Sequence, residues 1–395
     1  MSHPEQIFTL SIPDSELAYL RKKLEDVRFP DELNESGWDY GTPLTDVRRL
    51  VARWKDGYDW RAAEAKINTL PQFTRDIDVD QFGTLNIHYV HAKSQAKDAI
   101  PLLFAHGWPG HFLEVAKILP LLVSTGKHTS FHVVALSHPG FGFSEDPKKR
   151  GFGIKQYAEV AHKLMLALGY DEYVAQGGDW GYSICRMLAY LYGPKHVKAW
   201  HTNMPLASAP TLRENPRLYL QNLITPLSAE DVKGLQRQHD AWEILRKGFT
   251  TIQELTPQTI GYFMADSPTG LLSWIYEKLI RWTDNYPWED DEVLTWVSIY
   301  WFSRAGPTAA ARIYYEYFKN VAENMPPYSP VPLGVAYFPK ELLYAPKLWM
   351  RTVGDVVFTS EHPAGGHFAA HEQPEALVSD IRTMFSKTFI ADSPN

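Results

Sequence analysis

The sequence predicts an α/β fold, in which a mostly parallel central sheet carries an inserted helical lid and an N-terminal extension. Two observations point to this fold. Within residues 81–204, short apolar runs alternate with helical patterns, which is typical of a parallel sheet covered by helices on both faces. Residues 205–325 then form a series of helical patterns rich in aromatic side chains, and strand patterns return within residues 326–395. We therefore expect one sheet interrupted by a helical insertion.

The N-terminal extension is expected to cover residues 1–80 and to wrap around the core and the lid. A helix is predicted from Asp14 to Leu24, with Asp14 or Ser15 as its N-cap. Aromatic residues then occur at intervals in an otherwise polar, irregular segment, at Trp38, Trp54, Tyr58 and Trp60. Because burying aromatic surface is favourable, we expect this segment to pack against the rest of the protein.

The elements of the core are predicted from short runs of apolar residues. Strands are expected at 84–91, 101–105, 132–136, 173–175, 197–201, 333–338 and 356–358. Helices are expected at 154–168, at 182–190 and from Pro374 onward. The helical block between the fifth and sixth of these strands is either a lid over a site or an independent domain with its own core. Its place in the order of elements favours the lid.

The composition excludes several classes of function. With 45% hydrophobic residues the chain can bury a large core, and a net charge of −7 without a basic run argues against a nucleic-acid partner. Cys185 is the only cysteine, so we expect neither a disulfide framework nor a cysteine-based zinc site. The first residues do not resemble a secretory leader, and no stretch of about 18 apolar residues occurs. We therefore expect a soluble, cytoplasmic protein without a membrane anchor.

The most informative motif is Gly177-Gly178-Asp179-Trp180-Gly181, which lies between an apolar strand and a helix. Small residues around a central nucleophile at such a turn form the nucleophile elbow of α/β-hydrolases. The nucleophile here is a carboxylate, which can attack a saturated carbon and form an ester that water then hydrolyses. Epoxides and alkyl halides are substrates that need this chemistry. The alternative is that Asp179 only caps the following helix.

Such a nucleophile needs a base and an acid that orients the base, in the chain order nucleophile, acid, histidine. His367 follows the last strand and two glycines, so we expect it at the catalytic edge of the sheet. Glu341 follows the preceding strand and is the predicted acid, because ligand-facing residues lie beyond the carboxyl ends of parallel strands. Asp355 lies at the beginning of the last strand, which is the wrong edge, and Asn203 is a third candidate.

The turn at 106–110, with the sequence His-Gly-Trp-Pro-Gly, follows a predicted strand directly. Its composition suits a loop whose backbone N–H groups point into the site. We expect the N–H groups of Trp108 and Trp180 to form an oxyanion hole. This hole stabilises the tetrahedral species that forms when water attacks the ester of Asp179.

The segments 106–110, 177–181 and 365–370 resemble the corresponding motifs of microsomal-type epoxide hydrolases, including the soluble fungal members of that family. The lid stretches 256–261 and 266–272 and the N-terminal extension are similar as well, so the resemblance covers nearly the whole chain. It implies that the acid lies in a Phe-Pro-x-Glu/Asp element, which falls on Glu341.

The resemblance also implies two lid tyrosines that donate hydrogen bonds to the epoxide oxygen. One of these roles falls on Tyr314, but the second position is occupied by Phe249, which cannot donate a proton. Tyr314 acts alone, or another lid hydroxyl such as that of Tyr262 or Tyr315 takes the role, or the substrate is not an epoxide. We predict Phe249, Tyr262 and Tyr315 as substrate contacts.

The predicted function is hydrolysis of a small apolar epoxide to a vicinal diol through an ester on Asp179. The mechanism requires no metal and no organic cofactor. One alternative is a haloalkane dehalogenase with the same triad, in which the indole N–H groups of Trp180 or Trp108 bind the halide. Another is a weakly active binding protein on this scaffold. The expected partners are the substrate and water, and the N-terminal aromatic residues are compatible with a homodimer.

Overall fold

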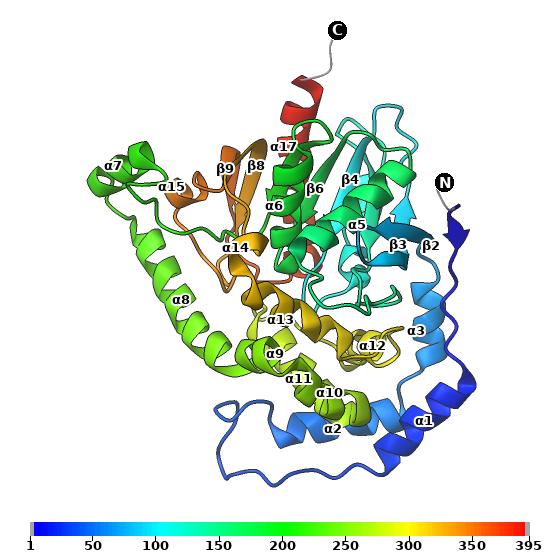
Figure 1. Ribbon diagram of the computed structural model, residues 1–395. Helices are drawn as coiled ribbons and strands as arrows, with labels where there is room; N and C mark the ends of the chain where they lie inside the picture. The colour runs from blue at the N-terminus through cyan, green and yellow to red at the C-terminus, as the bar shows by residue number, and fades with distance from the viewer. Residues whose placement is uncertain (1–3, 392–395) are drawn as a thin grey trace.

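In the computed structural model, which describes residues 4–391, a nine-stranded sheet has the strand order β1-β2-β3-β5-β4-β6-β7-β8-β9 (Figure 1). The side chains of 242, 244–247 and 387–391 lie outside this description. The strands are β1 Gln6–Ile7, β2 Gln72–Val79, β3 Gly83–Ala92, β4 Ile100–Ala105, β5 Phe131–Leu136, β6 Tyr173–Gly177, β7 Val197–Thr202, β8 Ser329–Tyr337 and β9 Gly354–Glu361.

The six strands from β5 to β9 across the sheet are parallel, and the antiparallel strands β1, β2 and β3 extend it beyond β5. From β4 the chain moves to β5 on one side and then returns to β6 on the other. The direction of winding therefore changes at β4, and the crevice beyond the carboxyl ends of β4 and β6 is where an open α/β sheet binds ligands. The predicted α/β-hydrolase fold is confirmed.

Helices cover both faces of the central parallel strands, which explains why β4, β5 and β6 are mostly apolar. Every residue of β6 is buried, as are the last four residues of both β4 and β5. Helices α5 and α6 lie together on one face, and α17 lies behind the sheet (Figure 1). The helices that surround the sheet on its two faces and at its edges are η1 Phe112–Val115, α4 Leu119–Val123, α5 Ile154–Ala167, α6 Trp180–Tyr192, α15 Lys347–Met350, α16 Ala369–Glu372 and α17 Pro374–Ala391.

The chain between β7 and β8 first runs along the left side of the sheet in Figure 1 and then forms the helical layer below it. Its buried residues join those of the sheet in one continuous core, which is what a lid rather than an independent domain requires. The indole of Trp296 donates a hydrogen bond to the carbonyl of Pro109 at 2.6 Å, and the hydroxyl of Tyr300 donates to Gly110 at 2.6 Å. The helices are α7 Pro216–Ile224, α8 Ala229–Leu245, η2 Arg246–Thr250, α9 Thr251–Leu255, α10 Pro257–Asp266, α11 Pro268–Arg281, α12 Asp290–Trp301, η3 Ala309–Ala311, α13 Arg312–Lys319 and α14 Val321–Asn324.

The N-terminal helices α1 Asp14–Glu25, α2 Leu44–Asp56 and α3 Trp60–Ile67 lie against the outside of this layer (Figure 1). The guanidinium group of Arg53 donates two hydrogen bonds to Asp291 on α12, at 2.7 and 2.8 Å. The hydroxyl groups of Tyr58 and Thr295 lie 2.9 Å apart. The extension thus binds the lid through both polar and aromatic contacts.

Two details of the N-terminal segment differ from the sequence-based expectations. Helix α1 begins after Pro13, and no side chain caps it, so Asp14 and Ser15 belong to its first turn. Strands β1 and β2 were not predicted, although both lie within residues 1–80 and pair with the sheet. Strand β2 alternates apolar residues with charged ones, so it lacks the continuous apolar run of a buried strand. Among residues 4–391, none of the helices combines the length and apolar composition needed to cross a bilayer.

Candidate active site

Asp179 occupies a strained turn between β6 and α6. Its φ is +50° and its ψ is −126°, a backbone conformation that non-glycine residues rarely adopt. A side chain at Gly181 would collide with the carbonyl of Ala105, so glycine lets α6 approach β4 closely. The Asp179 carboxylate makes no capping hydrogen bond to α6, which contradicts the capping alternative. The turn instead presents the carboxylate beyond the end of the sheet.

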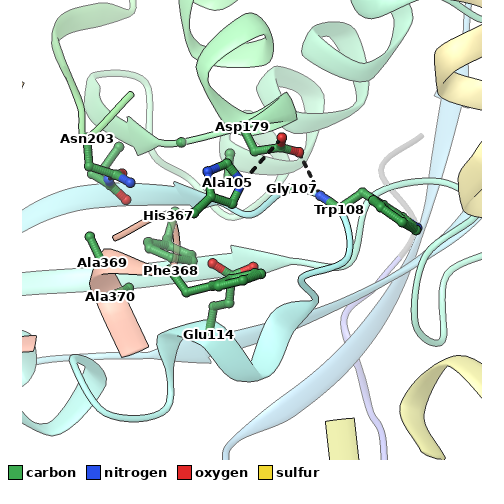
Figure 2. Close-up of a pocket in the computed structure, with 13 residues that line it drawn as sticks. Ala105, Gly107, Trp108, Glu114, Asp179, Asn203, His367, Phe368, Ala369 and Ala370 are labelled. Atoms are coloured by element: carbon green, nitrogen blue, oxygen red, sulfur yellow. Dashed lines mark hydrogen bonds and ion pairs between the residues drawn. The ribbon is translucent and has the colours of Figure 1, made fainter. Parts of the chain in front are cut away.

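A backbone donor holds one oxygen of this carboxylate. Ala105 at the end of β4 pairs with Gly177 at the end of β6, so the turns that follow these strands are neighbours. The N–H of Trp108 donates a hydrogen bond to Oδ1 of Asp179 at 2.7 Å (Figure 2). Trp180 is the first residue of α6, and the N–H groups of a first helical turn have no partner within the helix. Both predicted oxyanion-hole residues therefore adjoin the carboxylate.

The imidazole of His367 lies between two carboxylates. Its Nε2 is 3.5 Å from Oδ2 of Asp179, and its Nδ1 is 3.0 Å from each oxygen of Glu341. The N–H groups of Leu342 and Leu343 also donate to Oε1 of Glu341, which fixes this buried carboxylate. Burial alone lowers the pKa of His367, but the charges of Glu341 and Asp179 and hydrogen bonds to them hold it well above its usual value.

The structure places the three acid candidates in different surroundings. Glu341 lies beyond the carboxyl end of β8, in contact with His367, as its position in the sequence predicts. Asp355 is exposed near the beginning of β9, at the opposite edge of the sheet. Asn203 follows β7, lines the same cavity as Asp179 and His367, and accepts a hydrogen bond from the amide of Gln176 at 2.8 Å. Asn203 is thus a neighbour of the site that does not contact His367 through any described hydrogen bond.

Tyr314 faces the nucleophile from the lid. Helix α13 buries its side chain, with the ring edge-on to Trp180 at 4.8 Å between ring centroids. Burial raises the pKa of Tyr314 well above its usual value, and the charge of Asp179 raises it further, so the hydroxyl group stays protonated. Arg312, at the beginning of the same helix, pairs with the buried carboxylate of Asp146. This pair ties the helix that carries Tyr314 to the loop after β5.

Phe249 is also brought to the site. Its ring stacks on that of Trp108 with centroids 5.3 Å apart and an interplanar angle of 14°. It contacts the ring of Tyr314 edge-on at 5.9 Å and that of Trp282 at 5.2 Å. The residue that replaces the second tyrosine therefore belongs to an aromatic wall beside the nucleophile.

Two predicted substrate contacts lie elsewhere, which corrects the expectation for them. Tyr262 on α10 is 71% exposed and is absent from the cavity lining. The hydroxyl of Tyr315 accepts a hydrogen bond from Lys319 in an exposed position. Neither hydroxyl group replaces the one that Phe249 lacks, because the helical phase of α10 and α13 turns both of them outward.

Two buried polar residues beside the site are not among the predicted site residues, although the sequence offers Gln253 as a possible hydrogen-bond partner of substrate or lid backbone. Gln253 on α9 is fully buried, and its amide makes no hydrogen bond within the described residues, although it adjoins Tyr314. Glu114 is buried in the turn η1 and lines the cavity with Asp179 and His367 (Figure 2). Its signal in the sequence is a single acidic residue in the otherwise apolar segment Phe112–Val115, directly after the 106–110 turn.

Comparisons with known proteins agree with this geometry. The family model described as the epoxide hydrolase N terminus matches residues 5–115, and that of the alpha/beta hydrolase fold matches residues 100–225. The chain is 34% identical to epoxide hydrolase 1 of Sus scrofa, over 95% of this chain and 87% of the relative. It is 32% identical to juvenile hormone epoxide hydrolase 1 of Ctenocephalides felis, over 96% of this chain and 85% of the relative.

Solved structures show the same relationship. The structure of Aspergillus niger epoxide hydrolase matches with a TM-score of 0.85 and 32% sequence identity, over 98% of this chain and 97% of that chain. The structure of juvenile hormone epoxide hydrolase from the silkworm Bombyx mori matches with a TM-score of 0.89 and 26% sequence identity, over 99% of this chain and 96% of that chain. The similarity thus includes the N-terminal helices and the lid as well as the sheet. This chain belongs to the epoxide hydrolase family and is a hydrolase with the α/β-hydrolase fold.

Proposed function

We propose that the enzyme converts an apolar epoxide to a vicinal diol through a covalent ester on Asp179. The observation that carries this proposal is the surroundings of the Asp179 carboxylate. One of its oxygens accepts a hydrogen bond from the Trp108 N–H at 2.7 Å, while the other lies 3.5 Å from His367. The base and an oxyanion donor therefore lie next to a carboxylate that reacts twice, first at Oδ2 as a nucleophile and then at Cγ as an electrophile.

In the first step, Oδ2 of Asp179 attacks an epoxide carbon and the carbon–oxygen bond of the ring breaks. The leaving oxygen takes the proton of the Tyr314 hydroxyl, which burial keeps protonated. The products are a hydroxyalkyl ester and a tyrosinate. Because Oδ1 is held by the Trp108 N–H, it becomes the carbonyl oxygen of the ester and is already in the oxyanion hole.

In the second step, Nε2 of His367 takes a proton from water while the water oxygen bonds to Cγ of Asp179. The N–H groups of Trp108 and Trp180 stabilise the charge on Oδ1, and removal of one oxyanion-hole donor typically costs about 3–4 kcal/mol of transition-state stabilisation. The ester bond breaks, and the diol oxygen takes the proton from His367. The proton released by the regenerated Asp179 carboxyl restores the Tyr314 hydroxyl.

The aromatic wall suggests the substrate class. Rings of Trp108, Phe249, Trp282 and Tyr314 contact one another beside the nucleophile, so the group attached to the epoxide is apolar, and bulky or aromatic. Phe249 leaves one hydroxyl donor for the ring oxygen. We assign the buried amide of Gln253, next to Tyr314, as the second donor to the ring oxygen, because the hydroxyl groups of Tyr262 and Tyr315 face away from the site.

A dehalogenase is the second candidate, and one observation favours it. The indole N–H of Trp180 is buried beside Tyr314 and makes no other hydrogen bond within the described part of the chain, so a halide could accept from it. The same Asp179 chemistry would then release a halide instead of opening a ring. The covalent adduct distinguishes the two reactions.

The test is intact-protein mass spectrometry of His367→Gln after exposure to aryl and alkyl epoxides and to haloalkanes. This substitution leaves the nucleophile in place but removes the base, so the ester accumulates. A mass gain equal to a whole epoxide supports the proposal, and a gain equal to a haloalkane minus HX supports dehalogenation. The Asp179→Asn/His367→Gln double variant is the control and should gain no mass. Absence of an epoxide adduct on His367→Gln across the panel would contradict the epoxide proposal.

A further inference from the structure

A second cavity lies between the N-terminal extension and the lid. Its volume is about 410 Å³, within the roughly 300–1,000 Å³ that is usual for ligand pockets. Its walls come from α1, from the chain between Trp54 and Arg61, and from the end of α12, and these helices lie near one another in Figure 1. Its apolar lining consists of Leu17, Leu20, Leu24, Trp54, Trp60 and Phe302. Among the described residues this cleft shares none with the cavity at Asp179, so it is separate from the catalytic site.

Two buried polar groups of this cleft lack hydrogen-bond acceptors. Trp54 is 5% exposed, and its indole N–H makes no hydrogen bond within the described residues. The indole N–H of Trp60, in the same lining, donates to Glu64 at 3.2 Å. Ser298 is fully buried, and its hydroxyl group adjoins that of Tyr58 but is otherwise without a partner in the described part of the chain. Because an unpaired buried donor costs about 1–3 kcal/mol, a ligand that accepts from Trp54 and Ser298 would be favoured.

The charges around the cleft favour a negatively charged ligand. The charged side chains in the lining are Arg21, Lys55 and Arg61 against Asp56 and Asp59. Arg21 pairs with Glu25 at 3.5 Å, but these two side chains are 68% and 56% exposed. An exposed ion pair of this kind contributes about 0–1 kcal/mol, so Arg21 can exchange it for a ligand at little cost. An ionised carboxylate is negative and only accepts hydrogen bonds, which matches both the charge and the unpaired donors.

Helix α12 lies between the cleft and the catalytic loop. Ser298 lines the cleft, whereas Trp296 and Tyr300 donate hydrogen bonds to the carbonyls of Pro109 and Gly110, each at 2.6 Å. Positions two residues apart are separated by roughly 200° around a helix axis, so these side chains lie on opposite sides of α12. One side of the helix therefore contacts the cleft, and the other holds the loop that supplies the oxyanion donor.

We propose that this cleft is a second binding site, for a small aromatic carboxylate, and that α12 transmits its occupancy to the catalytic loop at 106–110. The ring of the ligand packs on the apolar lining, and the carboxylate accepts hydrogen bonds from the Trp54 indole and the Ser298 hydroxyl group. Arg21 supplies the opposite charge. A ligand in this position joins α12 to the extension, which restricts the movement of the helix and of the loop that it binds.

The first test is titration calorimetry of the full-length enzyme with 2-naphthoate, in the absence of epoxide. We expect saturable binding, and we expect Trp54→Phe and Ser298→Ala each to weaken it about three- to tenfold, the effect of one lost hydrogen bond. Trp349→Phe is the matched control, because the indole N–H of Trp349 donates to Asn222 at 2.9 Å outside the cleft. That variant should bind 2-naphthoate as the unmodified enzyme does.

The uncharged analogue 2-naphthylmethanol tests the role of charge. It has the same rings and one hydroxyl group, so it should bind more weakly than 2-naphthoate. Arg21→Gln should weaken the binding of 2-naphthoate and leave that of the alcohol unchanged. Equal losses for the two ligands would contradict the assignment of an anionic ligand.

Amide hydrogen exchange locates the ligand and tests transmission along α12. With 2-naphthoate bound, exchange should slow in segments 17–24 and 54–61 and in α12, and also in the catalytic loop at 106–110. Trp296→Phe removes the hydrogen bond from α12 to Pro109. In that variant the ligand should still protect the segments of the cleft, but its effect on the loop should be lost.

Absence of saturable 2-naphthoate binding would overturn the second site, as would binding that neither Trp54→Phe nor Ser298→Ala weakens. Protection confined to the cleft in the unmodified enzyme would overturn the transmission to the loop. These results are independent of the proposed function, because the measurements contain no epoxide and the catalytic residues are unchanged. If Ser298→Ala does not fold, Trp54→Phe and Arg21→Gln still decide whether the ligand occupies the cleft.

Discussion

Nε2 of His367 lies 3.5 Å from Oδ2 of Asp179, so the base and the nucleophile balance each other's charge until the nucleophile reacts. Esterification removes the negative charge of Asp179 and with it one of the two carboxylates that raise the pKa of His367. The imidazole therefore loses its proton more readily after the first step than before it. The first reaction prepares the base that the second reaction needs.

This coupling predicts a lower His367 pKa in Asp179→Asn, which mimics the uncharged ester. The sign follows from the loss of a nearby negative charge, which favours the neutral imidazole. NMR titration of the imidazole in both proteins measures the difference. Asp179→Asn should also abolish diol formation while leaving the thermal unfolding temperature near that of the unmodified enzyme. Equal imidazole pKa values in the two proteins would contradict the coupling.

The same raised pKa predicts how stability depends on pH. The unfolded His367 has a pKa of about 6.5, so its contribution to the free energy of unfolding is complete below that pH. The contribution is lost as pH rises through the higher pKa of the folded state. The difference in unfolding temperature between the unmodified enzyme and His367→Gln should therefore shrink as the solution is made alkaline. Calorimetry from acid to alkaline pH tests this, and a difference that grows instead would refute it.

Glu341→Gln should slow ester breakdown by about 10²–10⁴-fold, because the imidazole loses both its orienting contact and the charge that stabilises its protonated form. Ester formation should change much less, so the ester accumulates. Asp355→Asn is the control, since Asp355 is exposed at the opposite edge of the sheet. Single-turnover kinetics of both variants measures the effect. Normal ester breakdown in Glu341→Gln would assign the acid role to another residue.

Phe249→Tyr should speed ring opening, because it adds a second hydroxyl donor beside Tyr314. Hydrogen bonds to charged groups are worth about 1.5–3 kcal/mol, which corresponds to a rate gain of about ten- to a hundredfold. Burst-phase measurement of ester formation gives this rate. Tyr262→Phe removes an exposed hydroxyl group and should leave the rate unchanged. A Phe249→Tyr rate equal to that of the unmodified enzyme would mean that the second donor is already supplied, and Gln253→Leu should then be slower.

Arg312→Leu should destabilise the protein by about 1–2 kcal/mol, because it leaves the buried carboxylate of Asp146 without its partner, although Arg312 itself is partly exposed to solvent. The substitution should also reduce ring opening, since Arg312 begins the helix that carries Tyr314. Arg351→Leu, at an exposed position directly after α15, is the control and should change neither property. Thermal unfolding and ester formation are the two measurements. Unchanged stability in Arg312→Leu would show that Asp146 finds another way to satisfy its charge.

The parts of this fold that could be predicted are those in which one physical rule dominates. Strands β4 to β7 are buried on both faces, so each is a short, largely buried run rich in apolar residues that the sequence reveals within a residue or two. Strand β2 is buried mainly on one face and alternates with charged residues, so it was missed. Asp14 and Ser15 are residue types that suit an N-cap. The helix nevertheless begins earlier than they predict, because Pro13 takes the N-cap position with an extended backbone.

In the site, too, some residues follow from one physical rule and others do not. Chain order and strand ends predict Asp179, Glu341 and His367 as neighbours, because the topology of a parallel sheet brings these loops together. No comparable rule predicts which side chains of the lid face the nucleophile. Whether Tyr262, Tyr315 or Gln253 faces the nucleophile depends on the rotation of its helix, which only the packing of the lid determines. Glu114 was missed because an acidic residue in an apolar segment is ordinarily exposed, and its burial depends on a glycine four residues earlier.

Helix α12 is held by hydrogen bonds on two sides. On the outer side, Arg53 of α2 binds Asp291 of α12. On the inner side, the indole of Trp296 donates a hydrogen bond to the carbonyl of Pro109 on the catalytic loop. A lid with one free side can swing open as a flap, whereas this one is held between the chain's own N-terminal helices and the loop that supplies the oxyanion donor. A swinging motion of the lid would therefore have to break contacts on both sides of α12, the ion pair of Arg53 with Asp291 and the hydrogen bond of Trp296 to the catalytic loop.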